Sequence, residues 1–328
     1  MMLPEQTSGA GVKYELKDVL AAQVDQAVGW ETSDIGTAAE QELAAVLRAG
    51  MRRVPSENPF PARTDDITVD DVRVRIYRPD GTNDAIEPLP VMLFLHGGGW
   101  VGGDLETNDD ACRRLAVLTP CVVISVDYSL APEARYPVAL DEGWTVLRWI
   151  LREVESWGGD SNRLAIGGSS AGGNLAASIV RRAREEGVRV LAQLLFYPVL
   201  DASGATSSYS DFAEGYVLTA NQLRFFWRSY LGEQDVADRD DVSPGVSADL
   251  AGLPATYIVT AEYDPLRDEG EAYGAALNDA GISTVVRRFS GQIHGFVSFT
   301  ALTSDAPLAV EEAATWLAGN FRLESKKA

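Results

Sequence analysis

The seven residues Gly167-Gly168-Ser169-Ser170-Ala171-Gly172-Gly173 directly follow the short apolar segment Leu164-Ala165-Ile166. A serine with one glycine two residues before it and another two residues after it is typical of the strained strand-to-helix turn that exposes a nucleophile. Ser170 has this spacing through Gly168 and Gly172. Around Ser169 the second glycine position is occupied by Ala171. The pattern favours Ser170 as the nucleophile, and the alternative, a phosphate-binding turn, lacks the lysine of a P-loop.

Around this turn the chain alternates apolar strands with helical segments. After two short strands that begin near residue 66, strands are predicted at 90–95, 121–126, 163–166, 188–196, 255–260 and 284–289, and helices at 111–118, 138–155, 174–186, 266–280 and 309–321. Continuous apolar strands that alternate with helices indicate a mostly parallel sheet with helices on both faces. The expected fold class is therefore α/β.

Two regions depart from this alternation. Residues 1–60 contain helical spacing near 15–29 and 37–52, and we expect them to form N-terminal cap helices. Residues 203–250 separate two predicted strands and carry an aromatic run, so we expect a cap insertion there. The catalytic domain would then comprise residues 61–202 and 251–328.

The composition restricts the classes of partner. The chain has 328 residues with 46% hydrophobic content and a formal net charge of −20, from 28 basic and 48 acidic residues. Because an acidic chain repels phosphate backbones and anionic lipid, we expect neither nucleic-acid nor membrane partners. The first twenty residues lack the pattern of a secretory signal, so a cytoplasmic location is expected. Cys112 and Cys121 are predicted to be buried free thiols.

A glycine-rich loop follows the predicted strand 90–95. It reads His96-Gly97-Gly98-Gly99-Trp100. Such a loop can present backbone N–H groups to an oxyanion, together with the N–H of the residue after the nucleophile, here Ala171. An ordinary flexible turn is the alternative, but three glycines that follow a histidine and a strand make it the weaker interpretation.

An acid and a base follow two later strands. Asp264 comes after the predicted strand 255–260, and His294 comes after the last predicted strand. The order Ser170, Asp264, His294 is that of the triads in α/β-hydrolases. Asp264 could instead cap the helix that follows it, and Asp268 is a rival acid that we interpret as a surface charge.

Several stretches together resemble the hormone-sensitive-lipase-like family of esterases, also called bacterial esterase family IV. They are His96-Gly97-Gly98-Gly99-Trp100, Gly102-Gly103-Asp104-Leu105-Glu106-Thr107, Tyr128-Ser129-Leu130-Ala131-Pro132-Glu133, Gly168-Ser169-Ser170-Ala171-Gly172-Gly173, Tyr197-Pro198-Val199-Leu200-Asp201 and Asp264-Pro265-Leu266-Arg267-Asp268-Glu269-Gly270. The resemblance implies an α/β-hydrolase fold with a mostly parallel eight-stranded sheet and a helical cap. It further implies that no metal or organic cofactor is needed. It assigns the oxyanion hydrogen bonds to Gly98, Gly99 and Ala171, with His96 shaping the loop.

The chain departs from the family pattern at two positions. Ser169 stands where the family usually has aspartate, and Ser129 stands where it usually has arginine. We hypothesise that the two positions interact in the family. Loss of both charges would then cost little, whereas loss of one would leave a charge without its partner.

The expected function is hydrolysis of short- to medium-chain acyl esters by a serine carboxylesterase. An amidase or deacetylase with the same triad, and a ligand-binding protein on the same scaffold, are the alternatives. A long-chain lipase is disfavoured because no exposed lipid-binding segment stands out. The aromatic residues predicted to line the substrate pocket are Trp100, Tyr216, Phe225, Phe226 and Trp227. A homodimer is a further expectation, since many relatives dimerise through the sheet edge formed by 266–280 and 284–289.

Overall fold

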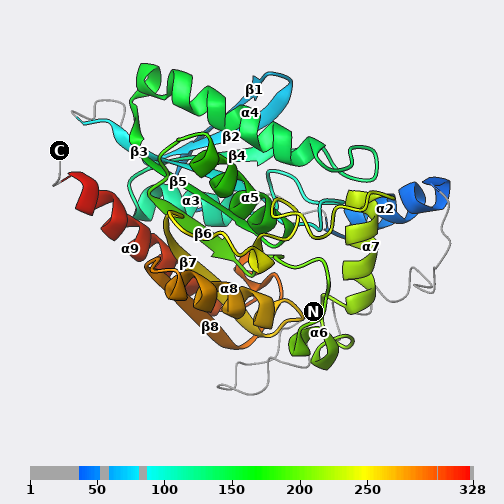
Figure 1. The fold of residues 1–328 in the computed structure, drawn as a ribbon. Helices are drawn as coiled ribbons and strands as arrows, with labels where there is room; N and C mark the ends of the chain where they lie inside the picture. The colour runs from blue at the N-terminus through cyan, green and yellow to red at the C-terminus, as the bar shows by residue number, and fades with distance from the viewer. Residues whose placement is uncertain (1–36, 52–58, 81–86, 301, 326–328) are drawn as a thin grey trace, which may run out of the picture.

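The computed structural model describes residues 37–51, 59–80, 87–300 and 302–325. These residues form one eight-stranded sheet with strand order β1-β2-β4-β3-β5-β6-β7-β8 (Figure 1). The strands are β1 (Arg63–Val69), β2 (Val72–Arg78), β3 (Leu89–Leu95), β4 (Val122–Asp127), β5 (Gly159–Ser169), β6 (Ala192–Phe196), β7 (Ala255–Tyr263) and β8 (Thr284–Ile293). β2 pairs antiparallel with β1 and β4, and all other neighbours are parallel. The predicted α/β class and sheet are confirmed.

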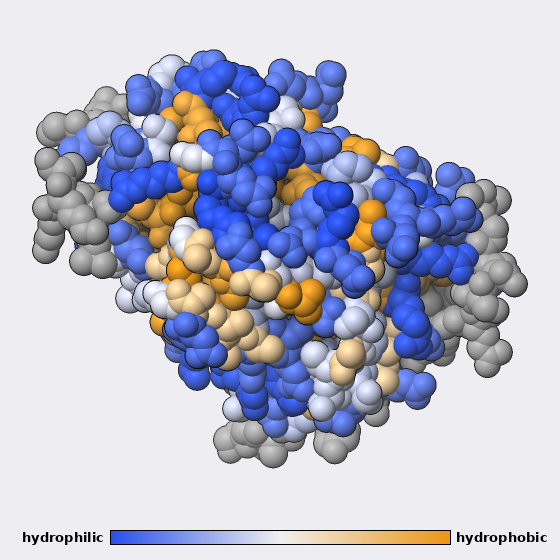
Figure 2. Space-filling view, viewed as in Figure 1, coloured by the Kyte–Doolittle hydropathy of each residue, from blue (hydrophilic) through white to orange (hydrophobic). Residues whose placement is uncertain are grey.

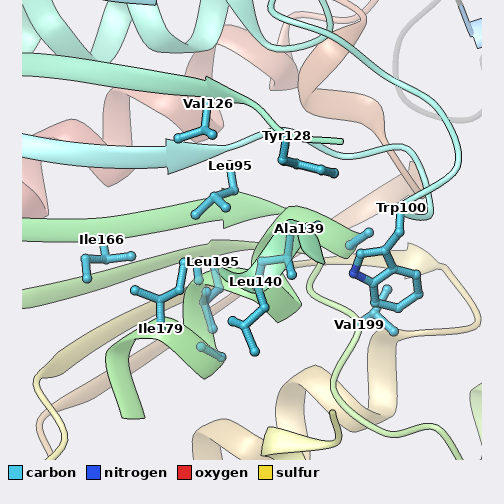
Figure 3. Close-up of a cluster of buried hydrophobic side chains, with 14 of the residues drawn as sticks. Leu95, Trp100, Val126, Tyr128, Ala139, Leu140, Ile166, Ile179, Leu195 and Val199 are labelled. Carbon is cyan, nitrogen blue, oxygen red and sulfur yellow. The ribbon is translucent and has the colours of Figure 1, made fainter. Parts of the chain in front are cut away.

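Helices cover both faces of the sheet, as predicted. The helices α4 (Val138–Glu153), α5 (Ala171–Glu185) and α8 (Arg267–Asp279) pack into one buried cluster, and α3 (Asp109–Leu118) and α9 (Asp305–Ser325) pack into a second. Strand β3 supplies both clusters, because successive side chains of a strand point to opposite faces. Leu93 and Leu95 belong to the first cluster, and Met92 and Phe94 to the second. Figure 3 shows Leu95 in the first cluster, near Ile179 of α5.

The ends of some elements differ from the prediction. β5 begins at Gly159 rather than near residue 163, because a polar stretch pairs with the start of β3 across an irregularity in the register. β6 begins only at Ala192 rather than near residue 188. α5 begins at Ala171, immediately after the serine pair, and not at residue 174. Pairing across the sheet decides these ends, and single-sequence patterns do not contain that information.

Among the described residues, three α-helices lie in the ranges predicted to form caps. α2 (Thr37–Met51) agrees with the expected helix at 37–52, whereas the expected helix at 15–29 lies outside the described residues. α6 (Ser207–Asp211) and α7 (Ala220–Leu231) lie within 203–250. α2 and α7 are neighbours at one end of the sheet in Figure 1 and line one cavity. The division into domains stays a prediction.

Arg48 connects the helix α2 to the sheet domain by hydrogen bonds and an ion pair. Its Nε donates to the carbonyl of Val101 (2.6 Å) and its Nη2 to that of Ala131 (2.7 Å). The guanidinium also pairs with Glu133 at 2.5 Å. Two carbonyls next to the glycine-rich loop are therefore satisfied by a side chain of the cap.

The visible surface is mainly hydrophilic, and both cysteines lie inside the protein. The face in Figure 2 is largely hydrophilic, with apolar side chains in small groups. Among the described helices, none is long and apolar enough to cross a membrane. Cys112 and Cys121 are buried and free, as predicted.

Candidate active site

Ser170 occupies the sharp turn between β5 and α5. Its backbone has φ +53° and ψ −120°, a conformation that side-chain-bearing residues rarely adopt. Two glycines make the turn possible. A Cβ on Gly168 would lie 2.3 Å from the carbonyl oxygen of Gly172, and one on Gly172 would lie 2.1 Å from that of Leu95. The glycine spacing in the sequence therefore reflects two close backbone approaches.

The structure brings Ser170, His294 and Asp264 together in one hydrogen-bonded row. The Oγ of Ser170 lies 2.8 Å from Nε2 of His294, across 124 residues of sequence. The Nδ1 of His294 lies 2.8 Å from Oδ2 of Asp264. Asp264 is fully buried, whereas 9% of Ser170 and of His294 is exposed. The imidazole is therefore placed to exchange a proton with the hydroxyl of Ser170, while the carboxylate of Asp264 orients the ring.

The two carboxylate oxygens of Asp264 have different partners. Oδ2 faces His294, and Oδ1 accepts the N–H of Leu266 at 2.9 Å. The carboxylate therefore fixes the turn before α8 and also orients the imidazole. Asp268 faces other partners, since its Oδ2 accepts the N–H of Ser208 (2.8 Å) and its Oδ1 contacts Arg267 (2.8 Å). It is half-buried at the surface and bonds to Ser208 of α6, so this charge also has a structural contact.

The glycine-rich loop lies against the serine turn. Gly98 has φ +131° and Gly99 has φ +61°, both in the region that favours glycine. A Cβ on Gly98 would lie 2.1 Å from the carbonyl oxygen of Gly102. Among the described residues, none accepts a hydrogen bond from the N–H of Gly98, Gly99 or Ala171. These three donors are the ones predicted to bind an oxyanion.

His96 supports the loop from within the protein. The side chain is fully buried, and burial lowers the pKa of its imidazole. Its Nδ1 lies 2.8 Å from the carbonyl oxygen of Gly97, and its ring stacks on Tyr128 at 4.2 Å between centroids. A neutral imidazole that donates to Gly97 fits the predicted role in shaping the loop.

The two serines that depart from the family pattern have separate environments. Ser129 is exposed, and both its N–H and its Oγ donate to Glu142, each at 2.6 Å. Ser169 is buried, and its Oγ donates to Oδ1 of Asn108 at 2.8 Å. The hypothesis that the two positions interact in the family stays a prediction, but in this chain each serine bonds to a different residue.

A cavity opens above Ser170 and His294. Together with its mouth, it encloses about 1310 Å³. Its lining comprises Val46, Leu47, Gly50, Met51, Gly97, Gly98, Gly99, Trp100, Gly103, Thr107, Ser169, Ser170, Tyr197, Val199, Val217, Leu218, Gln222, Leu223, Phe226, His294, Gly295, Ser298 and Phe299. Among these described residues, none has an acidic side chain, and His294 is the single one that can carry a positive charge.

The five aromatic residues predicted to line the substrate pocket lie in different places, and their role in substrate binding stays a prediction. Trp100 and Phe226 line the cavity, whereas Tyr216, Phe225 and Trp227 do not. Successive residues of a helix point about 100° apart, and in the run 225–227 the side chain that faces the cavity is that of Phe226. Phe225 and Trp227 are buried in the core, and Tyr216 stacks on Tyr263 at 5.3 Å.

The cap contributes cavity residues that the sequence analysis did not assign. Val46, Leu47 and Met51 come from α2, and Leu223 comes from α7, one turn before Phe226. The sequence contains a signal for Val46, Leu47 and Met51, because they are apolar positions of the predicted helix 37–52. The helical spacing of these apolar residues predicts that they face the protein. It does not indicate whether they lie in the core or line a cavity.

Glu269 is a buried carboxyl group in α8, the helix that follows Asp264. It is 4% exposed, and its Oε1 accepts the N–H of Leu200 at 2.6 Å. Burial raises its pKa well above the usual value, with the Leu200 N–H opposing the shift and the charges of Asp201 and Asp264 adding to it. The folded state therefore favours the protonated form of Glu269 more strongly than the unfolded chain does.

The raised pKa of Glu269 predicts how stability depends on pH. The folded state binds this proton more tightly than the unfolded state, so the contribution of Glu269 to stability is present at low pH and declines as pH rises. We expect Glu269→Gln to be neutral near pH 4 and to raise the Tm above wild type increasingly towards pH 9. Melting scans check this, with the exposed Glu186→Gln as control. An equal Tm difference at every pH would contradict it.

Comparisons with known proteins identify the family of this chain. Residues 92–298 match the model of the α/β hydrolase fold family. Carboxylesterase NlhH of Mycobacterium tuberculosis is 37% identical over 292 residues, which cover 86% of this chain and 89% of that protein. Esterase LipI of the same species is 38% identical over 267 residues, covering 79% and 83%. The structure of an ester hydrolase from the Lake Arreo metagenome, complexed with a bipyridine phosphonate derivative, has a TM-score of 0.81 at 36% identity, covering 98% and 99%.

The chain therefore belongs to the α/β-hydrolase fold family, in its hormone-sensitive-lipase-like branch. It is a carboxylic ester hydrolase. These relatives set aside the alternative of a binding protein without enzymatic activity. In the described residues, no group of three or more His, Cys, Asp and Glu side chains is placed to bind a metal.

Proposed function

We propose that the protein is a serine carboxylesterase that hydrolyses short- to medium-chain acyl esters through an acyl-enzyme. The observation that carries this proposal is the row of two 2.8 Å contacts from Ser170 to His294 and from His294 to Asp264. The N–H groups of Gly98 and Gly99, which no described residue accepts, support it.

In the first half-reaction Ser170 becomes acylated. The Asp264 carboxylate accepts Nδ1–H of His294, which leaves Nε2 free to accept the proton of the Ser170 hydroxyl. The Oγ attacks the ester carbonyl, and the resulting oxyanion accepts hydrogen bonds from the N–H groups of Gly98, Gly99 and Ala171. The protonated His294 then gives its proton to the leaving alkoxide, so the alcohol departs neutral.

In the second half-reaction water replaces the alcohol. His294 takes a proton from a water molecule, whose oxygen attacks the acyl carbon of the acyl-enzyme. The same three N–H groups bind the second oxyanion. When that intermediate collapses, His294 returns the proton to Oγ of Ser170, and the carboxylic acid is released. No atom of the enzyme is consumed.

The substrate class follows from the walls of the cavity. They are mainly aliphatic and aromatic, and no acidic, lysine or arginine side chain is among the described lining residues. A charged substituent would lose its hydration there without gaining a partner. The preferred substrates are therefore small neutral esters.

Parallel assays of an ester and an amide test the proposed function. We expect purified protein to hydrolyse p-nitrophenyl butyrate at a rate far above that of the matching anilide. An anilide rate that equals or exceeds the ester rate would favour the amidase alternative. Inhibition by a phosphonate that labels Ser170, located by peptide mass spectrometry, identifies the nucleophile independently of either substrate.

Phe226 is predicted to limit the size of the substrate. It is 4% exposed and lies over the oxyanion loop, since a Cβ on Gly99 would come within 2.4 Å of its ring. We expect Phe226→Ala to shift the preference towards bulkier groups in an acyl or an alcohol series, measured as ratios of kcat/KM between members of each series.

Phe225→Ala is the matched control for this prediction. Phe225 is 7% exposed, sits in the same helix and packs into the core, so its loss should cost stability of about 3 to 5 kcal/mol. It should leave the ratios of kcat/KM unchanged. If neither series responds to Phe226→Ala, Phe226 does not limit substrate size.

A further inference from the structure

Asn108 stands immediately before α3 and is only 3% exposed. An asparagine at this position usually turns its side chain back to accept an N–H of its own helix. The side chain of Asn108 makes no such capping bond. Its amide is therefore directed to something other than the helix it precedes.

The amide of Asn108 contacts three separate elements of the active site. Its Oδ1 accepts the hydroxyl of Ser169 at 2.8 Å and the N–H of Gly97 at 3.3 Å. Its Nδ2 lies 3.5 Å from Oγ of Ser298, in the short helix η4 (Phe296–Ser298) that follows His294. A carbonyl oxygen has two lone pairs, and both are used here.

Two of the elements that meet at Asn108, the glycine-rich loop and the serine turn, are also packed directly on one another. A Cβ on Gly97 would lie 3.0 Å from Oγ of Ser169 and 3.3 Å from Cβ of Ser170. There is little space for the oxyanion loop to shift relative to the nucleophile. The hydrogen bonds of Asn108 join the loop and the serine turn at this contact. They fix the orientation of the loop as well as its distance from the serine turn.

We propose that Asn108 is a positioning residue that sets the place of the oxyanion loop relative to the nucleophile turn and the histidine segment. This rests on the proposed function of the site. The amide is uncharged, so it aligns Gly97, Ser169 and Ser298 without placing a fixed charge next to a developing oxyanion. Ser169 then acts by donating its hydroxyl proton to Asn108, and its neighbour Ser170 performs the attack.

The test compares Asn108→Ala with Asn174→Ala. Asn174 is also fully buried, but its Nδ2 donates to the carbonyl of Val242 at 2.8 Å, away from the three elements. We expect Asn108→Ala to lower kcat about ten- to a hundredfold with KM little changed, because small displacements of reacting groups reduce rates by such factors. The affinity for a trifluoromethyl ketone, which needs the oxyanion donors, should fall in parallel. Asn174→Ala should keep kcat near wild type.

A second variant keeps the test decisive if Asn108→Ala folds poorly. Asn108→Asp retains an acceptor oxygen for Ser169 and Gly97 but not the Nδ2 donor. Amide hydrogen exchange in segments 95–103, 168–172 and 294–299 should rise in Asn108→Ala relative to the rest of the sheet. In Asn108→Asp it should return towards wild type in the first two segments.

Two results would overturn the proposal. One is an equal loss of kcat in the Asn108→Ala and Asn174→Ala variants, and the other is a rise in exchange spread evenly over the protein. Either would mean that Asn108 only stabilises the fold. If the wild-type protein hydrolyses no ester at all, the proposed function fails, whereas the exchange comparison still decides the positioning role.

Discussion

Replacing Ser170 with alanine will reduce ester hydrolysis by about 10⁵- to 10⁶-fold while the protein stays folded. The hydroxyl is the proposed nucleophile, and removing it leaves His294 with no Oγ at 2.8 Å to activate. Alanine is smaller than serine, and the glycines on both sides still permit the turn. The measurement is the initial rate with p-nitrophenyl butyrate, together with a melting curve.

Ser169→Ala is the internal control for this result. It removes a hydroxyl from the adjacent position and leaves Oδ1 of Asn108 with the N–H of Gly97. We expect it to retain most of the activity, within about tenfold of wild type. If Ser169→Ala is inactive and Ser170→Ala is active, the assignment of the nucleophile is refuted.

Replacing Asp264 with asparagine will lower kcat by about 10⁴-fold. The N–H of Leu266 needs an acceptor, so the amide oxygen is expected to face it, and the NH₂ group then faces Nδ1 of His294. Nδ1 must then accept, which puts the ring proton on Nε2. That nitrogen can no longer take the proton of Ser170.

Asp268→Asn is the matched control for the acid. Asp268 lies in the same segment and loses the same charge, but it bonds Ser208 and Arg267. The comparison needs kcat for both variants under the same conditions, and melting curves to exclude unfolding. A loss at Asp268 larger than the loss at Asp264 would reverse the roles of the two carboxylates.

The sheet and the strand-end motifs could be predicted because their signals are local. The glycines Gly168 and Gly172 stand at a fixed spacing around Ser170, and the apolar strands are continuous because helices cover both faces. The placement of Asp264 and His294 beside Ser170 followed from a second rule, that the carboxyl ends of parallel strands share one edge of the sheet.

The cavity walls could not be predicted in the same way. Phe225 and Phe226 are adjacent and equally apolar, and only the angular position of α7 decides which of them faces the cavity. The role of Asn108 was hidden for a related reason. An asparagine before a helix has the pattern of a cap, and only the structure reveals that its side chain turns towards Ser169 instead.

The contribution of α2 to the cavity has an evolutionary consequence. The hydrolytic groups stand on the ends of sheet strands, whereas Val46, Leu47 and Met51 come from a helix near the start of the chain. Arg48 joins that helix to the sheet domain through two backbone carbonyls, which every sequence possesses, and through the carboxylate of Glu133. On the proposed function, we therefore expect mutations in a short early part of the gene to change which esters are accepted and to leave the chemical step untouched. Diversification of substrate range and preservation of the reaction would then be separable in this architecture.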